Sequence, residues 1–145
     1  QILYNKVDLT FVLNGALGGL VSITAEPLAP TFMSAVVIGG IGGALVVFTV
    51  PLLDKFKIDD VVGAIPVHLV CGIWGTLAVP LTNSDAKFSI QLIGILSIGA
   101  FVLISSFILW YAVKAILGVR LSDEEEKDGA DKTEIGLSSY PEFTK

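Results

Sequence analysis

His68 is the residue whose type and position best suit chemistry, since it is the only histidine and lies in a long apolar stretch. An ionisable group in such a stretch is costly unless it lines a pathway or has a polar partner. Neutral imidazole donates a hydrogen bond from one ring nitrogen and accepts one at the other, so it can handle a small polar solute and its proton. The alternative is a histidine that only packs. We favour a functional role for His68 over a packing role because its surroundings are apolar.

A metal site competes for the same segment, because Cys71 follows His68 by three residues. Two ligands do not complete a site, and the sequence holds no further histidine or cysteine. We therefore predict no metal ion and no cofactor. A single cysteine also excludes an internal disulfide, and we interpret Cys71 as a small hydrophobe.

Asp59, Asp60 and Pro66 lead into the histidine. Acidic side chains at this point cap a helix and interact favourably with the positive end of its dipole. Pro66 has no amide donor, so the backbone from Asp60 to Pro66 is expected to be irregular or to begin its helix there. Irregular backbone at membrane depth is tolerated where it is buried in protein or lines a wet cavity. The segment from Asp60 to His68 is therefore the candidate site.

The composition defines the elements that must hold this segment. Of 145 residues, 53% are apolar and 16% are charged, and the mean hydropathy is +0.79. A soluble domain needs more polar surface, and a basic face for nucleic acid is absent. A helix needs about 20 mostly apolar residues to cross a bilayer. We predict an all-α, polytopic membrane helix bundle over residues 1–120, with spans at about 9–25, 32–53, 61–81 and 88–117.

Basic residues orient the spans, because they collect on the cytoplasmic side of a membrane. Five fall on one side of the predicted topology and Lys87 falls on the other; the five are Lys6, Lys55, Lys57, Lys114 and Arg120. Both ends of the chain should therefore face the cytoplasm. Glycines at four-residue spacing, Gly15 with Gly19 and Gly39 with Gly43, predict close helix packing. Asn14, Ser22, Thr24 and Glu26 add polarity to the first span, and Ser22 is expected to bond its own backbone.

Residues 121–145 form an acidic cytoplasmic tail that accounts for most of the net charge of −5. Ser122 and Glu125 have the spacing of a capping box, which predicts a short helix. The acidic run that follows would be repelled by an anionic inner leaflet. We favour a solvated end over a docking or gating element.

Three stretches resemble one known family. Residues 58–76 (IDDVVGAIPVHLVCGIWGT) are similar to the tenth-helix signature of the ammonium transporter (Amt/Mep/Rh) family, and residues 14–24 (NGALGGLVSIT) resemble its eighth helix. Gly118-Val119-Arg120-Leu121 resembles the start of its cytoplasmic tail, and the resemblance continues at Glu125, Gly129, Asp131, Gly136 and Tyr140. The chain opens at Gln1 on a loop-like stretch that runs to Asp8, so we expect it to be part of a larger unit.

The resemblance implies eleven-helix, inverted-repeat protomers assembled as homotrimers, with one pore in each. This chain would supply helices eight to eleven and the tail, and the remaining N-terminal helices would complete the transporter. His68 matches the second of two pore histidines, Asp60 an acidic residue that supports the pore segment, and Ala64 a pore-lining apolar residue. Thr24 matches a threonine near the conduction path.

This sequence departs from the pattern of the family at two places. Pro66 and Leu69 replace small residues common around the histidine, which affects local backbone or pore width. Ile135 precedes Gly136 where the family often has a histidine, so docking of a PII-type regulatory protein is a weaker expectation.

The function implied is transport of ammonium or ammonia across the plasma membrane through a histidine-lined apolar pore. It is not that of an enzyme, since a lone histidine without a nucleophile or metal set offers no reaction. One alternative is an ammonium-sensing transceptor that signals through its tail. Another is a structural membrane subunit in which His68 only packs.

Overall fold

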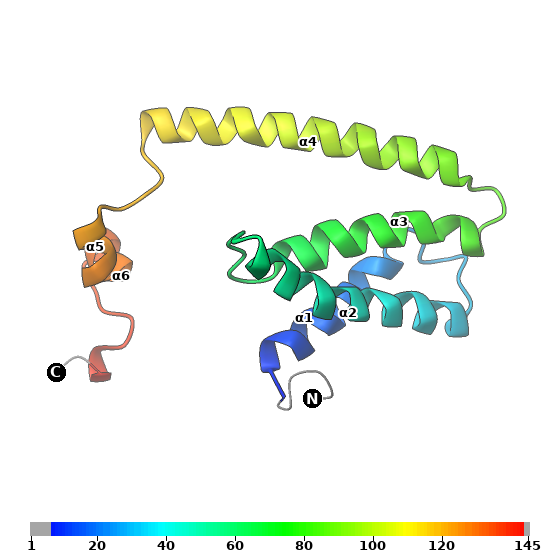
Figure 1. The fold of residues 1–145 in the computed structure, drawn as a ribbon, viewed down its shortest axis with the longest axis horizontal. Coiled ribbons are helices and arrows are strands. Elements are labelled where there is room, and N and C mark those ends of the chain that lie inside the picture. The colour runs from blue at the N-terminus through cyan, green and yellow to red at the C-terminus, as the bar shows by residue number, and fades with distance from the viewer. Residues whose placement is uncertain (1–6, 144–145) are drawn as a thin grey trace. The chain divides into compact units, whose positions relative to one another are not determined.

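The computed structural model describes residues 7–143, and within that range every regular element is helical, as the sequence predicts. The elements are α1 (Leu9–Ile23), α2 (Phe32–Lys55), the π-helix η1 (Ile65–Val70), α3 (Cys71–Thr82), α4 (Phe88–Ile116), α5 (Asp123–Asp128), α6 (Ala130–Ile135) and the 3₁₀ turn η2 (Pro141–Phe143) (Figure 1). The chain divides into two compact units, one through Gly99 and one from Ala100. The division falls inside α4, and each unit is described by itself.

Side-chain caps begin the first two helices. Asp8 Oδ1 accepts hydrogen bonds from the amides of Thr10 at 2.8 Å and Phe11 at 3.2 Å. The Thr31 hydroxyl accepts from the Ser34 amide at 3.2 Å. Such caps satisfy amides that have no partner within the helix. The predicted loop from Gln1 to Asp8 lies outside the described residues apart from its last two positions.

The first two helices pack along a seam of glycines, as their spacing predicts. Gly15 and Gly19 of α1 meet Gly43 and Gly39 of α2, so the two helices run antiparallel. A Cβ added at Gly19 would lie 3.1 Å from the carbonyl oxygen of Gly39. One added at Gly43 would lie 3.1 Å from that of Gly15. The backbones touch because no side chain separates them.

The third helical segment, η1 with α3, packs against both. The Trp74 indole N–H donates to the carbonyl oxygen of Ile38 on α2 at 3.0 Å. Cys71 is fully buried and its thiol donates to the carbonyl oxygen of Gly42 at 3.3 Å. Val46 and Val67 are also buried and complete a small core with Cys71. This core lies directly beneath the turn that carries His68.

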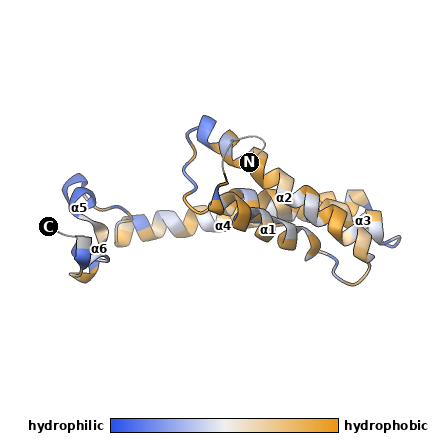
Figure 2. Cartoon of the chain, turned by 90° about the horizontal axis from the view of Figure 1, so that it is seen from below, coloured by the Kyte–Doolittle hydropathy of each residue, from blue (hydrophilic) through white to orange (hydrophobic). Residues whose placement is uncertain are grey.

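Among the described residues, three helical segments have the length and composition to cross a bilayer: Phe32–Lys55, Ile65–Thr82 and Phe88–Ile116. Most of their residues are hydrophobic (Figure 2). The first helix has 15 residues, which is about 22 Å at 1.5 Å per residue and shorter than a bilayer core of about 30 Å. Crossing by α1 as a fourth span therefore stays a prediction. None of the residues of α4 is buried.

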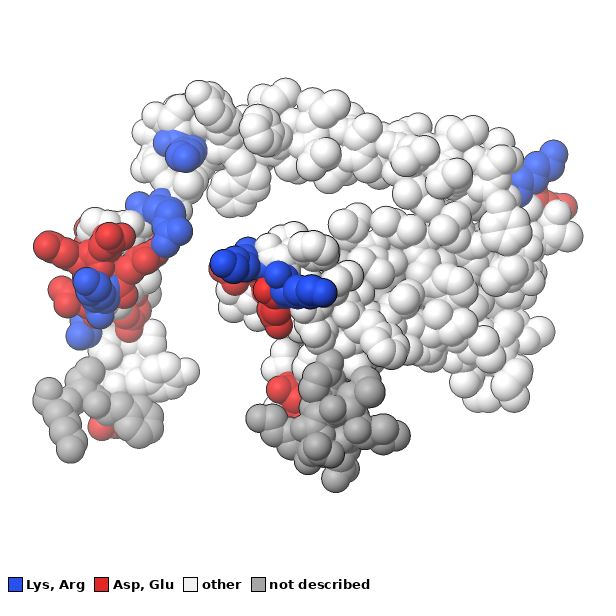
Figure 3. Space-filling model, in the orientation of Figure 1, with Lys and Arg blue, Asp and Glu red and all other residues white. Residues whose placement is uncertain are grey.

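Charged side chains lie at the ends of the helices of the first unit (Figure 3). Lys55 and Lys57 are at the end of α2 and just beyond it, and Lys87 lies between α3 and α4. This distribution leaves an uncharged surface along the helices. Lys6, also used for the orientation, lies outside the described residues.

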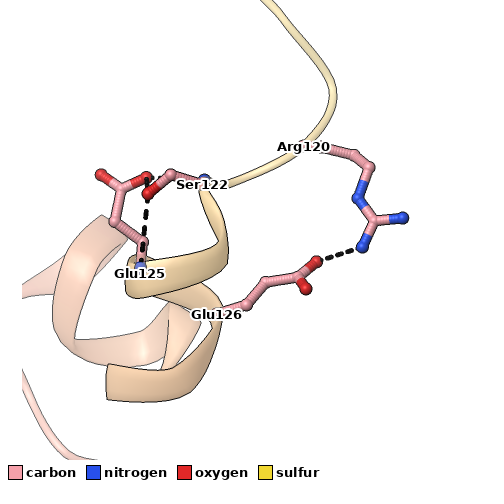
Figure 4. A network of polar contacts seen from close by, with 4 residues as sticks. All are labelled: Arg120, Ser122, Glu125 and Glu126. Atoms are coloured by element: carbon pink, nitrogen blue, oxygen red, sulfur yellow. Dashed lines mark hydrogen bonds and ion pairs between the residues drawn. The ribbon is translucent and has the colours of Figure 1, made fainter.

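The acidic tail folds locally in the second unit. The predicted capping box is present: the Ser122 hydroxyl accepts from the Glu125 amide, and the Glu125 carboxylate accepts from the Ser122 amide at 2.8 Å (Figure 4). This backbone amide, with the Ser122 hydroxyl, holds the pKa of Glu125 below its ordinary value. Arg120 forms an ion pair with Glu126 in the same turn (Figure 4).

A second contact closes the end of the tail. The Ser139 amide donates to Asp131 Oδ2 at 2.6 Å across eight residues. This hydrogen bond and that from the Ser139 side chain lower the pKa of Asp131.

Candidate functional site

The site begins with the turn before the third helical segment. Val62 lies in this turn, and Gly63, with a φ of +77°, separates it from the helix, so the Val62 carbonyl is outside the helical hydrogen-bond pattern. The side-chain amide of Asn14 donates to this carbonyl, with Nδ2 3.1 Å from the Val62 oxygen. Pro66 follows in the first turn of the helix, where amides have no partner within the helix and proline is well tolerated.

Asp60 supplies the acceptors that the same turn lacks. Its Oδ1 accepts from the Ala64 amide and its Oδ2 from the Ile65 amide, each at 2.8 Å. The Val67 amide then donates to the Gly63 carbonyl at 3.1 Å and begins the regular pattern. Asp60 thus caps the His68 helix, as the sequence predicts. The irregular backbone also lies where expected, since the helical geometry starts only after Gly63, whose φ is +77°.

The π geometry around His68 is a feature that the sequence did not predict. The Cys71 amide donates to the carbonyls of His68 and Pro66, three and five residues earlier. A five-residue span widens the turn relative to an α-helix. His68 lies in the middle of the widened turn.

His68 and Ala64 lie on the surface of the first unit, whereas Pro66, Val67 and Cys71 face its interior. No described residue hydrogen-bonds to the His68 imidazole. Val62 and Leu69, also exposed, flank it with apolar surface. The structure therefore brings Asp60, Ala64 and His68 together on one short segment.

Thr24 lies apart from that segment. It caps the end of α1, where its hydroxyl donates to the Val21 carbonyl at 2.7 Å. Its neighbour Ser22 contacts the backbone of Gly75, seven residues beyond His68 and so roughly 10 Å farther along the helix. Ser22 itself donates to the carbonyl of Gly18 at 2.7 Å, which is the own-backbone bond expected.

A cavity of about 220 Å³ opens beside the capped turn. It is lined by Asp8, Thr10, Phe11, Asn14, Val50, Asp60, Val61 and Gly63. Asp8 and Asp60 place two carboxylates at its wall, between the beginnings of α1 and η1. From the sequence, Asn14 is expected only to add polarity to the first span. No local pattern indicates its contact with Val62, because the two residues are 48 positions apart.

A separate polar contact joins the loops at the other end of these helices. The Asn83 side-chain amide donates to Glu26 Oε2 at 3.1 Å. It connects the loop after α1 with the end of α3. The hydrogen-bond partner of Glu26 therefore lies outside the His68 segment.

Apolar helices of spanning length and glycine-mediated packing define a polytopic helical membrane protein. Residues 1–140 match the model of the Ammonium Transporter Family. The chain belongs to this family.

Individual proteins of known name are similar to this chain over most of its length. A Synechocystis sp. protein provisionally named as an ammonium transporter is 44% identical over 133 residues, covering 90% of this chain and 30% of its own length. The ammonium transporter Amt1 of Haloferax mediterranei is 36% identical, covering 95% of this chain and 28% of its own length. The ammonium transporter Amt2 of Archaeoglobus fulgidus is 35% identical, with 95% and 34% covered. The chain therefore spans about a third of the length of these relatives.

Proposed function

We propose that this chain is the C-terminal part of a transporter that moves ammonium or ammonia across the plasma membrane through a histidine-lined apolar pore. The observation that carries the proposal is the exposed position of His68 on an otherwise apolar face of a helix of the ammonium transporter family. A polar imidazole turned toward lipid would be costly. The proposal therefore includes the remaining N-terminal helices of the same transporter, covering this face and forming the pore with it.

The chemistry follows from desolvation. Carrying the bare ammonium cation through an apolar passage costs far more than carrying neutral ammonia. Ammonium would release its proton at the outer mouth, and ammonia would pass along the face that carries Ala64 and His68. The imidazole can donate to the lone pair of ammonia or accept from its N–H, and can hand on a proton through its second nitrogen.

The other predicted residues take supporting roles in this proposal. Asp60 holds the start of the His68 helix by its two hydrogen bonds to backbone amides. Thr24 would lie near the outer part of the pathway, at the level of α3 beyond His68. The basic residues at the end of α2 support an orientation in which this end and the tail are cytoplasmic. A homotrimer and a PII-type partner at the tail complete the proposal.

Electrogenic ammonium uptake on a solid-supported membrane tests the role of His68. Proteoliposomes of the complete protein are compared with His68→Ala and with Thr76→Val, a control whose hydroxyl only bonds its own helix at 2.8 Å. We expect a saturable current that the control retains and His68→Ala loses. Unchanged transport in His68→Ala would remove this role from the histidine.

Signalling through the tail is the second candidate, because residues 122–139 form their own hydrogen-bonded turns. Truncation after Arg120 separates the two functions. A transporter keeps its uptake without the tail. A transceptor loses ammonium-dependent signalling, and its full-length form shows little net flux.

A further inference from the structure

We propose that Asn14 is a positioning residue that fixes where the His68 helix begins; its effect on transport rests on the function proposed above. Asn14 lies on α1, 48 residues before the backbone oxygen that it contacts. It is 8% exposed, and its Nδ2 lies 3.1 Å from the Val62 oxygen. A buried side-chain amide between two elements holds them in one register, because displacement leaves both partners unpaired.

The position of Val62 explains why its partner comes from another helix. Val62 lies in the turn before Ala64, and the φ of +77° at Gly63 is not helical, so the helix directs no backbone amide at the Val62 oxygen. Asn14 on α1 supplies the donor instead.

Gly63 provides the space for the amide. A Cβ added at Gly63 would lie 2.6 Å from Asn14 Nδ2, well inside normal contact distance. Its φ of +77° is also one that residues with a side chain rarely adopt. Asn14 and Gly63 therefore match each other in size, and the backbone conformation at Gly63 suits a residue without a side chain.

The Asn14–Val62 hydrogen bond affects the orientation of His68 because it holds the start of the helix that carries it. Asp60 holds the Ala64 and Ile65 amides from within the same turn, whereas Asn14 holds Val62 from α1. A shift of the helix by one residue turns a side chain by about 100° around the axis. Without the anchor from α1, the imidazole would no longer be held in one direction relative to the bundle.

The test compares Asn14→Leu, which keeps the branched shape but loses the donor, with Asn83→Leu, which removes the Asn83–Glu26 hydrogen bond at the opposite end. Hydrogen exchange of the backbone amides of residues 61–72 is measured in the complete protein, together with uptake. We expect exchange about tenfold faster in Asn14→Leu only, as for loss of one buried hydrogen bond. We expect maximal uptake to fall about tenfold or more with apparent KM little changed, as for a misplaced group.

The comparison with Asn83→Leu separates positioning from general stability, because that variant removes a side-chain amide hydrogen bond away from the His68 segment. Asn14→Asp, similar in size but without the donor, serves if Asn14→Leu does not fold. Unchanged exchange in residues 61–72, or equal changes in Asn83→Leu, would overturn the proposal. An intact protein without uptake would instead refute the transport function, and the exchange comparison would still decide the role of Asn14.

Discussion

Gly75 on α3 lies directly against Ser22 at the end of α1, and a Cβ at Gly75 would be 2.4 Å from the Ser22 carbonyl oxygen. The obstacle is backbone, which cannot rotate away as a side chain can. Gly72, one turn earlier on the same helix, has no atom within 4 Å of the corresponding point. The two glycines therefore have different reasons to be small.

Substitution by alanine should separate them. We expect Gly75→Ala to lower the free energy of unfolding by about 1–3 kcal/mol, because α1 and α3 must move apart. Gly72→Ala should be neutral or slightly stabilising, since alanine favours a helix. Thermal unfolding of both variants in the same detergent measures the difference, and equal midpoints would show that α1 and α3 are not in contact here.

Gly63 combines a crowded position with a left-handed backbone, whereas Gly118 has the same φ of +77° and no atom near its missing Cβ. Gly118→Ala should cost only the conformational strain, about 1–2 kcal/mol. Gly63→Ala should cost more, because its methyl group displaces the Asn14 amide. Chemical unfolding of the two variants gives the comparison. A smaller cost at Gly63 would contradict the contact with Asn14.

Asp60 and Asp59 are neighbours with different surroundings. Asp60→Ala leaves the Ala64 and Ile65 amides without acceptors, so we expect a loss of about 1–2 kcal/mol, as for a helix cap. It should also speed amide exchange at these two positions. Asp59→Ala, at an exposed neighbouring residue, should change neither quantity. Equal effects of both substitutions would mean that charge, and not the cap, holds the turn.

The capping box of the tail should depend on pH. The hydrogen bonds from Ser122 lower the pKa of Glu125 from an ordinary value of about 4.5. A lowered carboxyl pKa stabilises the turn above the unfolded pKa, and this stabilisation is lost as pH falls through the folded value.

Nuclear magnetic resonance titration of the Ser122 amide should show a midpoint below 4.5. Glu125→Gln should abolish this step, and Glu124→Gln, on the neighbouring residue outside the box, should preserve it. A midpoint at or above the ordinary value would argue against the box.

Particular residues show which parts of the structure are predictable from sequence. The apolar runs at 32–53 and 88–117 become helices at Phe32–Lys55 and Phe88–Ile116, because length and composition alone define them. The first run ends at Ile23, two residues earlier than expected, where Thr24 caps the helix. Spacing likewise identified the glycine seam and the capping box, since both are local patterns.

The His68 segment was only partly predictable. Pro66 and Asp60 correctly indicated an irregular start, because proline lacks a donor and aspartate caps helices. The Asn14–Val62 hydrogen bond joins residues 48 positions apart, which no local pattern contains, and nothing in the local sequence predicted the π turn. The roles of His68, Ala64 and Thr24 in a pathway remain predictions that the transport experiments address.

The glycine seam between α1 and α2 has a thermodynamic consequence. Glycine has no side-chain rotamers, so packing Gly15 and Gly19 against Gly43 and Gly39 freezes no side-chain motion at these positions. Lipid gives little hydrophobic driving force for helices to associate, so their packing depends on van der Waals contact. At the glycine seam, the loss of side-chain entropy offsets little of the free energy gained from this contact. The pair can then act as a stiff reference frame: Asn14, on the helix that carries Gly15 and Gly19, anchors the turn before His68 to a surface with little freedom of its own.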